Sequence, residues 1–295
     1  MTQPPVVFDR SLQRRRRRRA ASAEGATFLL DRVAGELADR LGTVLRRFDV
    51  AVDLGTPGEA VRAALLRLDS AGMVVGAEVL PRGKPFVVAD EETLPFADGA
   101  LDLVVSALAL QDVNDLPGAL LQIRRALKPD GLFLAALFGG ETLTELRQSF
   151  AAAESEIEGG VSPRVAPFAD LRDLGALLQR AGFALPVTDV DRLTVRYDSV
   201  FGLLRDLRRM GATNSLVARR RKPLRRATLR RMTEIYALQF ADHDGRIRAT
   251  FDIVWLSGWA PHPDQQQPLK PGSAKARLAD ALGVREISAG EKASR

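Results

Sequence analysis

The segment Phe48-Asp-Val-Ala-Val-Asp53-Leu-Gly-Thr-Pro-Gly58 decides the fold that the sequence predicts. Its first half is a short apolar strand that ends in Asp53, and a turn with two glycines, Gly55 and Gly58, follows. Glycine has no side chain, so a ligand can reach the backbone of this turn and the N-terminus of the helix predicted at residues 59–68. In open α/β sheets, ligands bind at this end of the strands. The segment therefore predicts both an α/β sheet and the position of its binding site.

Strands and helices alternate along the rest of the chain. Further strands are predicted at residues 73–77, 85–89, 101–106 and 132–138, a turn at 128–131, and helices at 24–46, 116–127, 142–158 and 169–181. Nearly continuous apolar strands separated by helices are typical of a parallel sheet. Residues 187–195 and 246–257 alternate apolar and polar side chains, so we expect them to close the sheet as an antiparallel pair. The predicted fold class is α/β: a Rossmann-like, seven-stranded, mostly parallel sheet with helices on both faces.

The net charge of this chain comes from two short segments. The sequence has 43 Lys and Arg residues against 37 Asp and Glu residues, a formal net charge of +6. Six arginines are consecutive, Arg14 to Arg19, and eight more basic residues lie between Arg219 and Arg231. Outside these two segments the chain carries a net charge of −8. A uniformly basic, nucleic-acid-coating protein is therefore not indicated, and we expect no DNA partner.

The composition excludes several other classes of protein. The chain contains no cysteine, which excludes disulfides, thiolate catalysis and cysteine-ligated metal sites. No apolar run approaches the roughly 18 to 20 residues of a membrane span. The residues after Arg19 include acids where a secretory signal has its apolar core. We therefore expect a soluble, cytoplasmic protein.

Acidic residues follow the predicted strands at one edge of the sheet. Asp53 ends the first strand, and Glu78 ends the second, where an acid can accept hydrogen bonds from both hydroxyls of a ribose. Asp90 and Glu91 follow the third strand, where an acid can accept from an exocyclic amine while apolar neighbours cover a base. Ser106 ends the fourth strand. The candidate cofactor-binding residues are therefore Asp53, Gly55, Gly58, Glu78, Asp90, Glu91 and Ser106.

Several longer motifs are more specific than these single residues. They include Asp90-Glu-Glu-x-Leu-Pro-Phe96, Phe138-Gly-Gly-x-Thr-Leu-x-Glu-Leu-Arg147, Asp173-Leu-Gly-x-Leu-Leu-x-Arg-Ala-Gly-Phe183, Asp206-Leu-x-x-Met-Gly211 and Gly272-Ser-Ala274. The order of the strand-end acids resembles that of class I S-adenosylmethionine (SAM) methyltransferases. The longer motifs resemble the family of mitochondrial respiratory complex I assembly factor 5 and its bacterial relatives. A more distant similarity is to the malonyl-carrier-protein methyltransferase of biotin synthesis.

The resemblance implies a domain organisation and a function. Residues 47–257 would form the SAM-dependent methyltransferase-fold domain, with a helical insertion at 198–245 before the last strand. Residues 1–46 would be a basic N-terminal arm and helical lid, and residues 258–295 an extended tail. The mitochondrial member of the family is associated with hydroxylating an arginine of an iron–sulfur-carrying complex I subunit. The implied function is SAM-dependent modification of a protein side chain, with a respiratory complex I subunit as the partner.

Two other functions stay open. One is a carrier-bound acyl or small-molecule methyltransferase, which the same fold supports. The other is a catalytically silent assembly chaperone with a degenerate SAM site. Methyl transfer needs little besides positioning because the sulfonium of SAM is already activated, so no catalytic residue is nominated.

The chain departs from the resemblance at the cofactor turn. The family pattern is Asp-x-Gly-x-Gly-x-Gly, whereas this chain has Pro57 and Glu59 at the second and third glycine positions. Proline removes an amide donor, and a glutamate near the methionine carboxylate of SAM would repel it unless its side chain turned away. Gln111 and Asp112 replace a His-Trp pair, so we expect the loss of an aromatic wall of the pocket. These departures argue against tight SAM binding, but not against the fold.

Two basic segments and two histidines have competing interpretations. The Arg14–Arg19 run is either a phosphate-binding arm for RNA or a membrane, or a solvated helix or lid whose arginines face solvent. The second is favoured because no aromatic residues alternate with the arginines. The 219–231 cluster either grips an acidic partner or is a solvated helix face. His243, His262 and Asp264 are residue types of a non-haem iron triad, but surface histidines are common in such turns, so no metal site is predicted.

Overall fold

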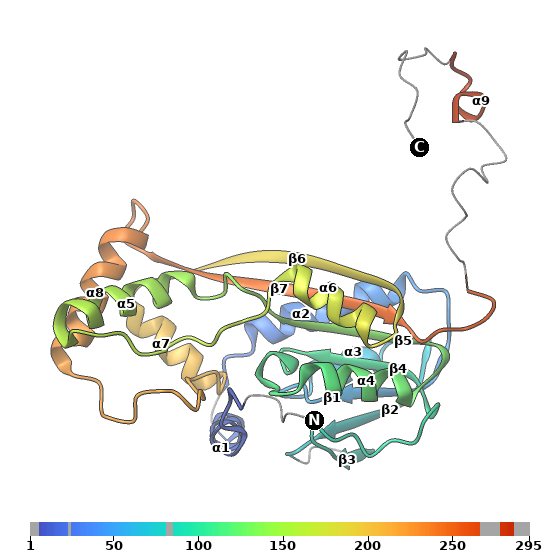
Figure 1. The fold of residues 1–295 in the computed structure, drawn as a ribbon, viewed down its shortest axis with the longest axis horizontal. Helices are drawn as coiled ribbons and strands as arrows, with labels where there is room; N and C mark the ends of the chain where they lie inside the picture. Colours follow the sequence, from blue (N-terminus) through green and yellow to red (C-terminus); the bar gives the residue numbers. More distant parts are fainter. Residues whose placement is uncertain (1–5, 23–24, 81–84, 266–277, 286–295) are drawn as a thin grey trace. The chain divides into compact units, whose positions relative to one another are not determined.

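The structure is a computed structural model that describes residues 6–22, 25–80, 85–265 and 278–285. These residues contain a seven-stranded sheet in the order β3-β2-β1-β4-β5-β7-β6 (Figure 1). The strands are β1 (Phe48–Leu54), β2 (Ala71–Glu78), β3 (Phe86–Val88), β4 (Leu101–Ala107), β5 (Leu127–Phe138), β6 (Ala184–Tyr197) and β7 (Ile247–Trp259). β7 is antiparallel to β5 and β6, and the other neighbouring pairs are parallel. The predicted fold class, including the antiparallel closing pair, is confirmed.

Helices cover both faces of this sheet. One face carries α2 (Phe28–Gly42), α3 (Ala60–Leu65), α5 (Thr144–Glu158), α7 (Val200–Arg209) and α8 (Arg226–Phe240), and the other carries α4 (Leu116–Ala126) and α6 (Leu171–Arg180). Side chains alternate between the faces along a strand. In β5, for example, Leu134 and Ala136 pack on the first group of helices, whereas Phe133 and Ala135 pack on the second. The sheet therefore lies between two hydrophobic clusters, as a buried parallel sheet requires.

The ends of the chain differ in detail from the sequence prediction. The helix predicted at residues 24–46 is α2, which is shorter, and a separate helix, α1 (Arg10–Ala21), precedes it. Asp9 caps α1 by accepting a hydrogen bond from the Leu12 amide. The chain divides into two compact units, Met1–Pro261 and His262–Arg295, and the second contains a short helix, α9 (Leu278–Leu282). The predicted domain boundaries stay predictions, and the motif at residues 272–274 lies outside the described residues.

The start of β5 also differs from the prediction. Residues 128–131 are predicted as a turn but form a bulge within β5, because β4 pairs with β5 in two registers separated by a shift. Asp130 has a φ of +65°, a conformation that Asp tolerates better than most residues. Its amide donates to the Ala260 carbonyl at 3.0 Å, and the Ala260 amide donates to the Gly131 carbonyl at 2.8 Å. Hydrogen bonds with Ala260, the residue that follows β7, therefore stabilise this conformation.

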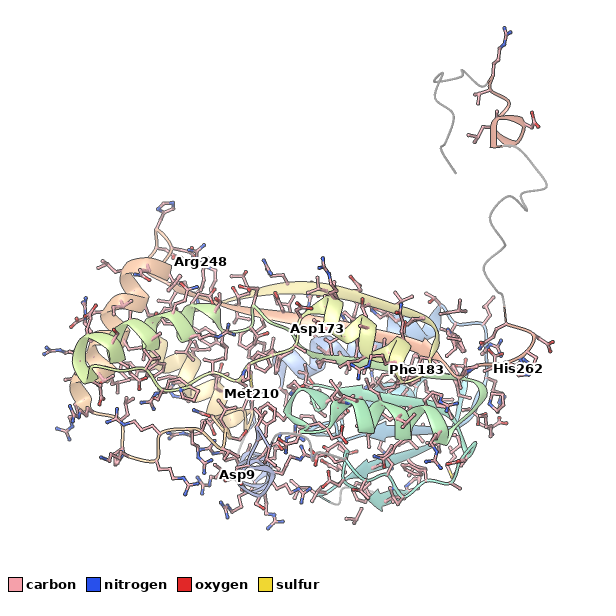
Figure 2. All side chains as sticks on the ribbon, in the orientation of Figure 1. Asp9, Asp173, Phe183, Met210, Arg248 and His262 are labelled. Atoms are coloured by element: carbon pink, nitrogen blue, oxygen red, sulfur yellow. The ribbon has the colours of Figure 1, made fainter. Side chains whose placement is uncertain are left out.

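The last strand packs tightly against the start of β6. Phe183 precedes β6, and its position is labelled in Figure 2. Its ring stacks on Phe133 of β5, with a distance of 5.4 Å between the ring centroids. Gly258 of β7 lies against the same ring, and a Cβ atom at this position would be 2.9 Å from the Cβ of Phe183. Position 258 of β7 therefore has space only for a residue without a side chain, because Phe183 occupies the adjacent space.

Gly258→Ala is therefore expected to destabilise the protein. The added methyl group has no space beside Phe183, and overpacking of this kind costs about 1–3 kcal/mol of unfolding free energy. Gly140→Ala is the matched control, since no atom lies within 4 Å of a Cβ at Gly140. Urea denaturation of both variants checks the prediction. Equal stabilities for the two variants would show that the contact with Phe183 does not restrict residue 258.

Candidate functional site

The carboxyl ends of β1, β2 and β4 lie next to one another at the middle of the sheet. Asp53 near the end of β1 pairs with Gly76 of β2 on one side and Val105 of β4 on the other. β1 is therefore the strand at which the chain order reverses, from β1-β2-β3 on one side to β4-β5 on the other. Ligands of open α/β sheets bind in the crevice at such a reversal. The turn after β1 lies at this position.

Hydrogen bonds fix the turn after β1 against both neighbouring strands. The Gly55 amide donates to the Ala77 carbonyl of β2 at 2.8 Å. The Thr56 hydroxyl accepts from the Ala107 amide of β4 at 3.0 Å. Gly55 has a φ of +71° and Gly58 a φ of +121°, both in the region that favours glycine. Hydrogen bonds to both neighbouring strands therefore hold the turn in this conformation, with Gly55 and Thr56 buried and Pro57 and Gly58 half-buried.

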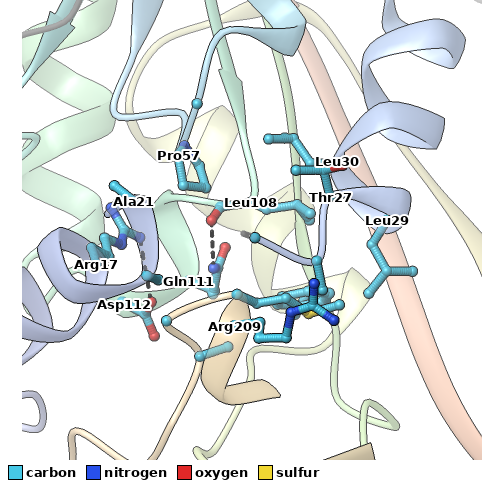
Figure 3. A pocket seen from close by; sticks show the side chains of 18 of the residues that line it. Arg17, Ala21, Thr27, Leu29, Leu30, Pro57, Leu108, Gln111, Asp112 and Arg209 are labelled. Atoms are coloured by element: carbon cyan, nitrogen blue, oxygen red, sulfur yellow. Dashed lines mark hydrogen bonds and ion pairs between the residues drawn. The ribbon is translucent and has the colours of Figure 1, made fainter. Parts of the chain in front are cut away.

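A cavity of about 220 Å³ opens beside this turn (Figure 3). Its wall comes from α1, the start of α2, the β1 turn, the ends of β2 and β5, and the end of α7. The lining residues are Arg17, Ala20, Ala21, Gly25, Ala26, Thr27, Leu29, Leu30, Pro57, Gly58, Glu78, Leu108, Gln111, Asp112, Phe138, Arg209, Met210, Gly211 and Ala212. Of the candidate cofactor-binding residues, only Gly58 and Glu78 line this cavity.

Asp53 and Ser106 are buried deeper, beneath the cavity. Asp53 lines a smaller cavity that also includes Gly58 and Glu78. Among the described residues, Asp53 Oδ1, Ser106 Oγ and Gln111 Oε1 are buried atoms that have no hydrogen-bond partner. Buried polar atoms are normally hydrogen-bonded, so unpaired ones at a strand end are consistent with a site for a polar ligand. The unpaired Asp53 and Gln111 oxygens belong to residues that line the two cavities, and a nucleoside has hydroxyl and amine donors for such acceptors.

Asp90 and Glu91 are paired with arginines of α1. Arg10 donates to Asp90 at 3.0 Å and also pairs with Glu91, and Arg14 pairs with Asp90. Arg17 lies 3.5 Å from Glu91. Burial raises the pKa of Asp90, but a backbone amide and the Arg10 and Arg14 guanidinium groups outweigh burial and lower it overall. The two acids predicted to bind an exocyclic amine therefore form ion pairs with α1, and their role in binding a cofactor stays a prediction.

The position of α1 corrects one interpretation of the arginine run. In the favoured interpretation the arginines face solvent, but Arg14 and Arg17 point inward, to the acids of the site. With Arg10 they follow the spacing of one helix face, since residues four and seven apart lie close together. Arg15, Arg18 and Arg19 lie on the exposed face. A run of identical residues shows no periodicity, so the sequence alone could not separate the two faces.

The residues that depart from the family pattern also have defined positions. Glu59 is turned toward Arg62, at 3.4 Å, and its side chain is 51% exposed, so it does not line the main cavity. Gln111 lines the cavity and donates to the Leu108 carbonyl at 2.8 Å. Asp112 accepts from Gln13 of α1 at 2.6 Å. Burial raises the pKa of Asp112, although Arg17 and Gln13 oppose this. The positions of the His-Trp pair are thus occupied by two polar residues, of which Asp112 contacts α1.

The residues just before α1 contact the start of the 219–231 cluster. Phe8, just before α1, pairs with Leu216, and Asp9 forms an ion pair with Arg219 at 3.1 Å. Other arginines of the 219–231 cluster bind acids of the same chain: Arg220 and Arg225 pair with Glu158, and Arg231 pairs with Glu156. These internal pairs reduce the charge that is available to an acidic partner. The two segments therefore meet at Asp9 and Arg219, whereas Arg231 of α8 pairs with an acid of α5.

The histidines do not indicate a metal site. His262 accepts a hydrogen bond from the Asp264 amide through Nδ1, at 3.1 Å. In the part of the chain that the structure describes, no group of three or more His, Asp or Glu side chains is placed to hold a metal ion.

Among the described residues, none of the helices combines the length and the hydrophobicity that crossing a membrane requires.

The strand order, the glycine turn at the reversal point and the acid at the end of β2 define a class I methyltransferase fold. Residues 54–135 match the family model described as a methyltransferase domain, which supports SAM as the cofactor. A putative methyltransferase from Bacillus halodurans C-125 has a similar structure, with a TM-score of 0.53 and 15% identity over 77% of this chain and 98% of that one. The YcgJ protein of Bacillus subtilis has a TM-score of 0.52 and 15% identity over 78% of this chain and 98% of that one.

Known proteins match nearly the whole chain. The chain is 38% identical over 293 residues to the mitochondrial arginine-hydroxylase NDUFAF5 of Danio rerio. The matched residues cover 95% of this chain and 91% of that one. The chain is 35% identical over 275 residues to a malonyl-[acyl-carrier protein] O-methyltransferase of Laribacter hongkongensis, with 86% and 90% covered. The chain belongs to the complex I assembly factor 5 (NDUFAF5) family of class I SAM-dependent methyltransferases. The resemblance seen in its motifs is confirmed.

Asp53 is expected to make the stability of the protein depend on pH. Burial raises its pKa from 3.8 to about 7, with Thr56 opposing and Glu78 adding to the shift. Between about pH 4 and about pH 7 the folded protein keeps a proton that the unfolded chain has released. The free energy of unfolding therefore falls as pH rises through this window, by about 4 kcal/mol in total.

Asp53→Asn removes this titration and should flatten the pH dependence, measured by urea denaturation between about pH 5 and about pH 8. Asp49→Asn is the matched control, because Asp49 lies in the same strand and its side chain is 75% exposed. The control should keep the pH dependence of the natural protein. An Asp53→Asn variant whose stability still falls as steeply with pH would show that another group titrates.

Proposed function

We propose that this chain is a SAM-dependent enzyme that modifies an arginine side chain of a partner protein. The observation that carries the proposal is the composition of the cavity wall. Gly58 and Glu78 line it at the carboxyl ends of β1 and β2, where this fold binds its cofactor. Residues 25–27, 29–30 and 209–212 supply much of the remaining wall, and we place the acceptor against them. The similarity to proteins named arginine-hydroxylase supports arginine as that acceptor.

The roles of the chain's own residues follow from their positions. Glu78 accepts hydrogen bonds from the ribose hydroxyls, since its carboxylate lines the cavity at the end of β2. Leu29, Leu30 and Met210 line the cavity and suit the methylene groups of an arginine side chain. α1 covers the site and excludes water from the reacting groups. When bound, SAM supplies a methyl group on an activated sulfonium.

Transfer to a carrier-bound acyl group is the second candidate. Arg209 lines the cavity and lies 4.0 Å from Asp206. A guanidinium group can bind a free carboxylate through two parallel hydrogen bonds, which suits a malonyl group. The similarity to a malonyl-[acyl-carrier protein] O-methyltransferase supports this candidate.

For the first candidate, the proposed partner is a respiratory complex I subunit. The cytoplasmic location expected from the sequence stays a prediction.

Glu78→Gln is expected to lower the affinity for S-adenosylhomocysteine roughly 10-fold or more, because hydrogen bonds to a charged group are lost. Isothermal titration calorimetry measures this affinity directly. Glu36→Gln is the matched control, since Glu36 pairs with Arg40 on the outside of α2. The control should bind like the natural protein. Absence of binding to the natural protein would contradict both enzyme candidates and favour the silent chaperone.

Mass spectrometry of candidate acceptors after incubation with SAM separates the reactions. A methyl group added to an arginine supports the first candidate. A hydroxyl group on an arginine also supports it when dioxygen and a two-electron reductant are added to the incubation, because hydroxylation consumes both. A methyl ester on a carrier-bound acyl group supports the second. If SAM binds and neither acceptor is modified, the arginine proposal is wrong for the acceptors tested, and a different substrate of the same site is required.

A further inference from the structure

We propose that Arg17 of the lid helix binds the methionine carboxylate of SAM and so replaces a donor that the turn after β1 has lost. This inference rests on SAM as the cofactor, and it names the residue that holds the amino-acid end of that molecule. It follows from three observations: the contacts of Arg17, the chemistry of the turn, and the positions of the other arginines.

Arg17 lines the cavity and lies against the β1 turn (Figure 3). Its Nη1 atom is 3.4 Å from the Gly55 carbonyl oxygen and 3.5 Å from Glu91 Oε1, and its Nη2 atom is 3.5 Å from Asp112 Oδ2. Hydrogen bonds from N–H groups are usually about 2.9–3.0 Å long, so all three contacts are loose. A guanidinium group has five N–H donors in a planar fork. Arg17 therefore has donors that are not engaged in short hydrogen bonds and that lie at the cavity wall.

The β1 turn itself is poorly equipped to bind a carboxylate. Pro57 lines the cavity but has no amide N–H to donate. Glu59 follows two residues later, and its negative charge is paired with Arg62 away from the main cavity. The turn thus offers one donor fewer than a turn with glycine at position 57. A cation beside Pro57 supplies both the missing donor and a favourable charge.

The other arginines near the site are less suitable. Arg10 and Arg14 of the same helix pair with Asp90 and Glu91 and do not line the cavity. Arg209 lines the cavity but projects from the end of α7, whereas Arg17 contacts the turn itself, with Nη1 3.4 Å from the Gly55 carbonyl oxygen. α1 and α7 are held together, since a Cβ on Gly211 would lie 3.3 Å from Ala20 Cβ. Arg17 is therefore fixed beside the turn by the packing of its own helix.

Calorimetry with two compounds tests the assignment in the full chain. S-adenosylhomocysteine carries the amino-acid group, whereas 5′-methylthioadenosine has the same adenosine and sulfur but no carboxylate. Arg17→Gln should lower the affinity for S-adenosylhomocysteine roughly 10- to 100-fold and leave the affinity for 5′-methylthioadenosine unchanged. Arg18→Gln is the matched control, since Arg18 is on the exposed face of α1, and it should change neither affinity. Combining Arg17→Gln with Pro57→Gly should recover part of the loss.

Three results would overturn the inference. Unchanged affinity of Arg17→Gln for S-adenosylhomocysteine would show that Arg17 is not a ligand. Equal losses for both compounds would show that Arg17 only supports the lid. If the natural protein binds neither compound, the cofactor assignment fails and this inference fails with it. Should Arg17→Gln not fold, Arg17→Lys, which keeps the charge but loses the planar fork, should still lose affinity for S-adenosylhomocysteine alone.

Discussion

The buried carboxylate of Glu91 is the interaction on which the site depends. Its side chain is 2% exposed and lies directly over Gly55, where a Cβ atom would be 2.5 Å from Oε1. Arg10 of α1 pairs with the same carboxylate. Leaving a buried charge without its partner costs about 3–5 kcal/mol, so Glu91 requires Arg10 of α1. Its side chain also requires glycine at position 55, because a Cβ atom there would overlap with it. One side chain thereby contacts both the turn and α1.

This arrangement gives arginines of the basic N-terminal segment a structural role within the chain. The inward arginines of α1 neutralise the acids at the end of β3, so they contribute to the site and not to a surface for nucleic acid. The same helix brings Arg17 to the cavity wall beside Pro57. α1 and the turn after β1 are therefore connected through Glu91, which pairs with Arg10 and lies against Gly55. A departure in the turn, such as Pro57, can be offset by a residue on the lid without any change in the sheet.

Much of the fold could be predicted from the sequence because apolar strands and their turns are local signals. Asp53 and Glu78 were expected at the same edge because parallel strands end together, and both line cavities there. The roles of Asp90 and Glu91 depend on α1, a helix far away in the sequence, so local patterns could not reveal their partners. The bulge at residues 128–131 has the same cause, since its conformation depends on hydrogen bonds with Ala260.

Hydrogen–deuterium exchange of the full chain, with and without S-adenosylhomocysteine, tests most directly whether the lid and the cofactor site form one unit. Saturation with the compound should slow exchange at the amides of residues 10–21 and of residues 55, 56 and 58, because the ligand contacts the turn and α1 together. Slower exchange in the turn with unchanged exchange in α1 would contradict the coupling between them.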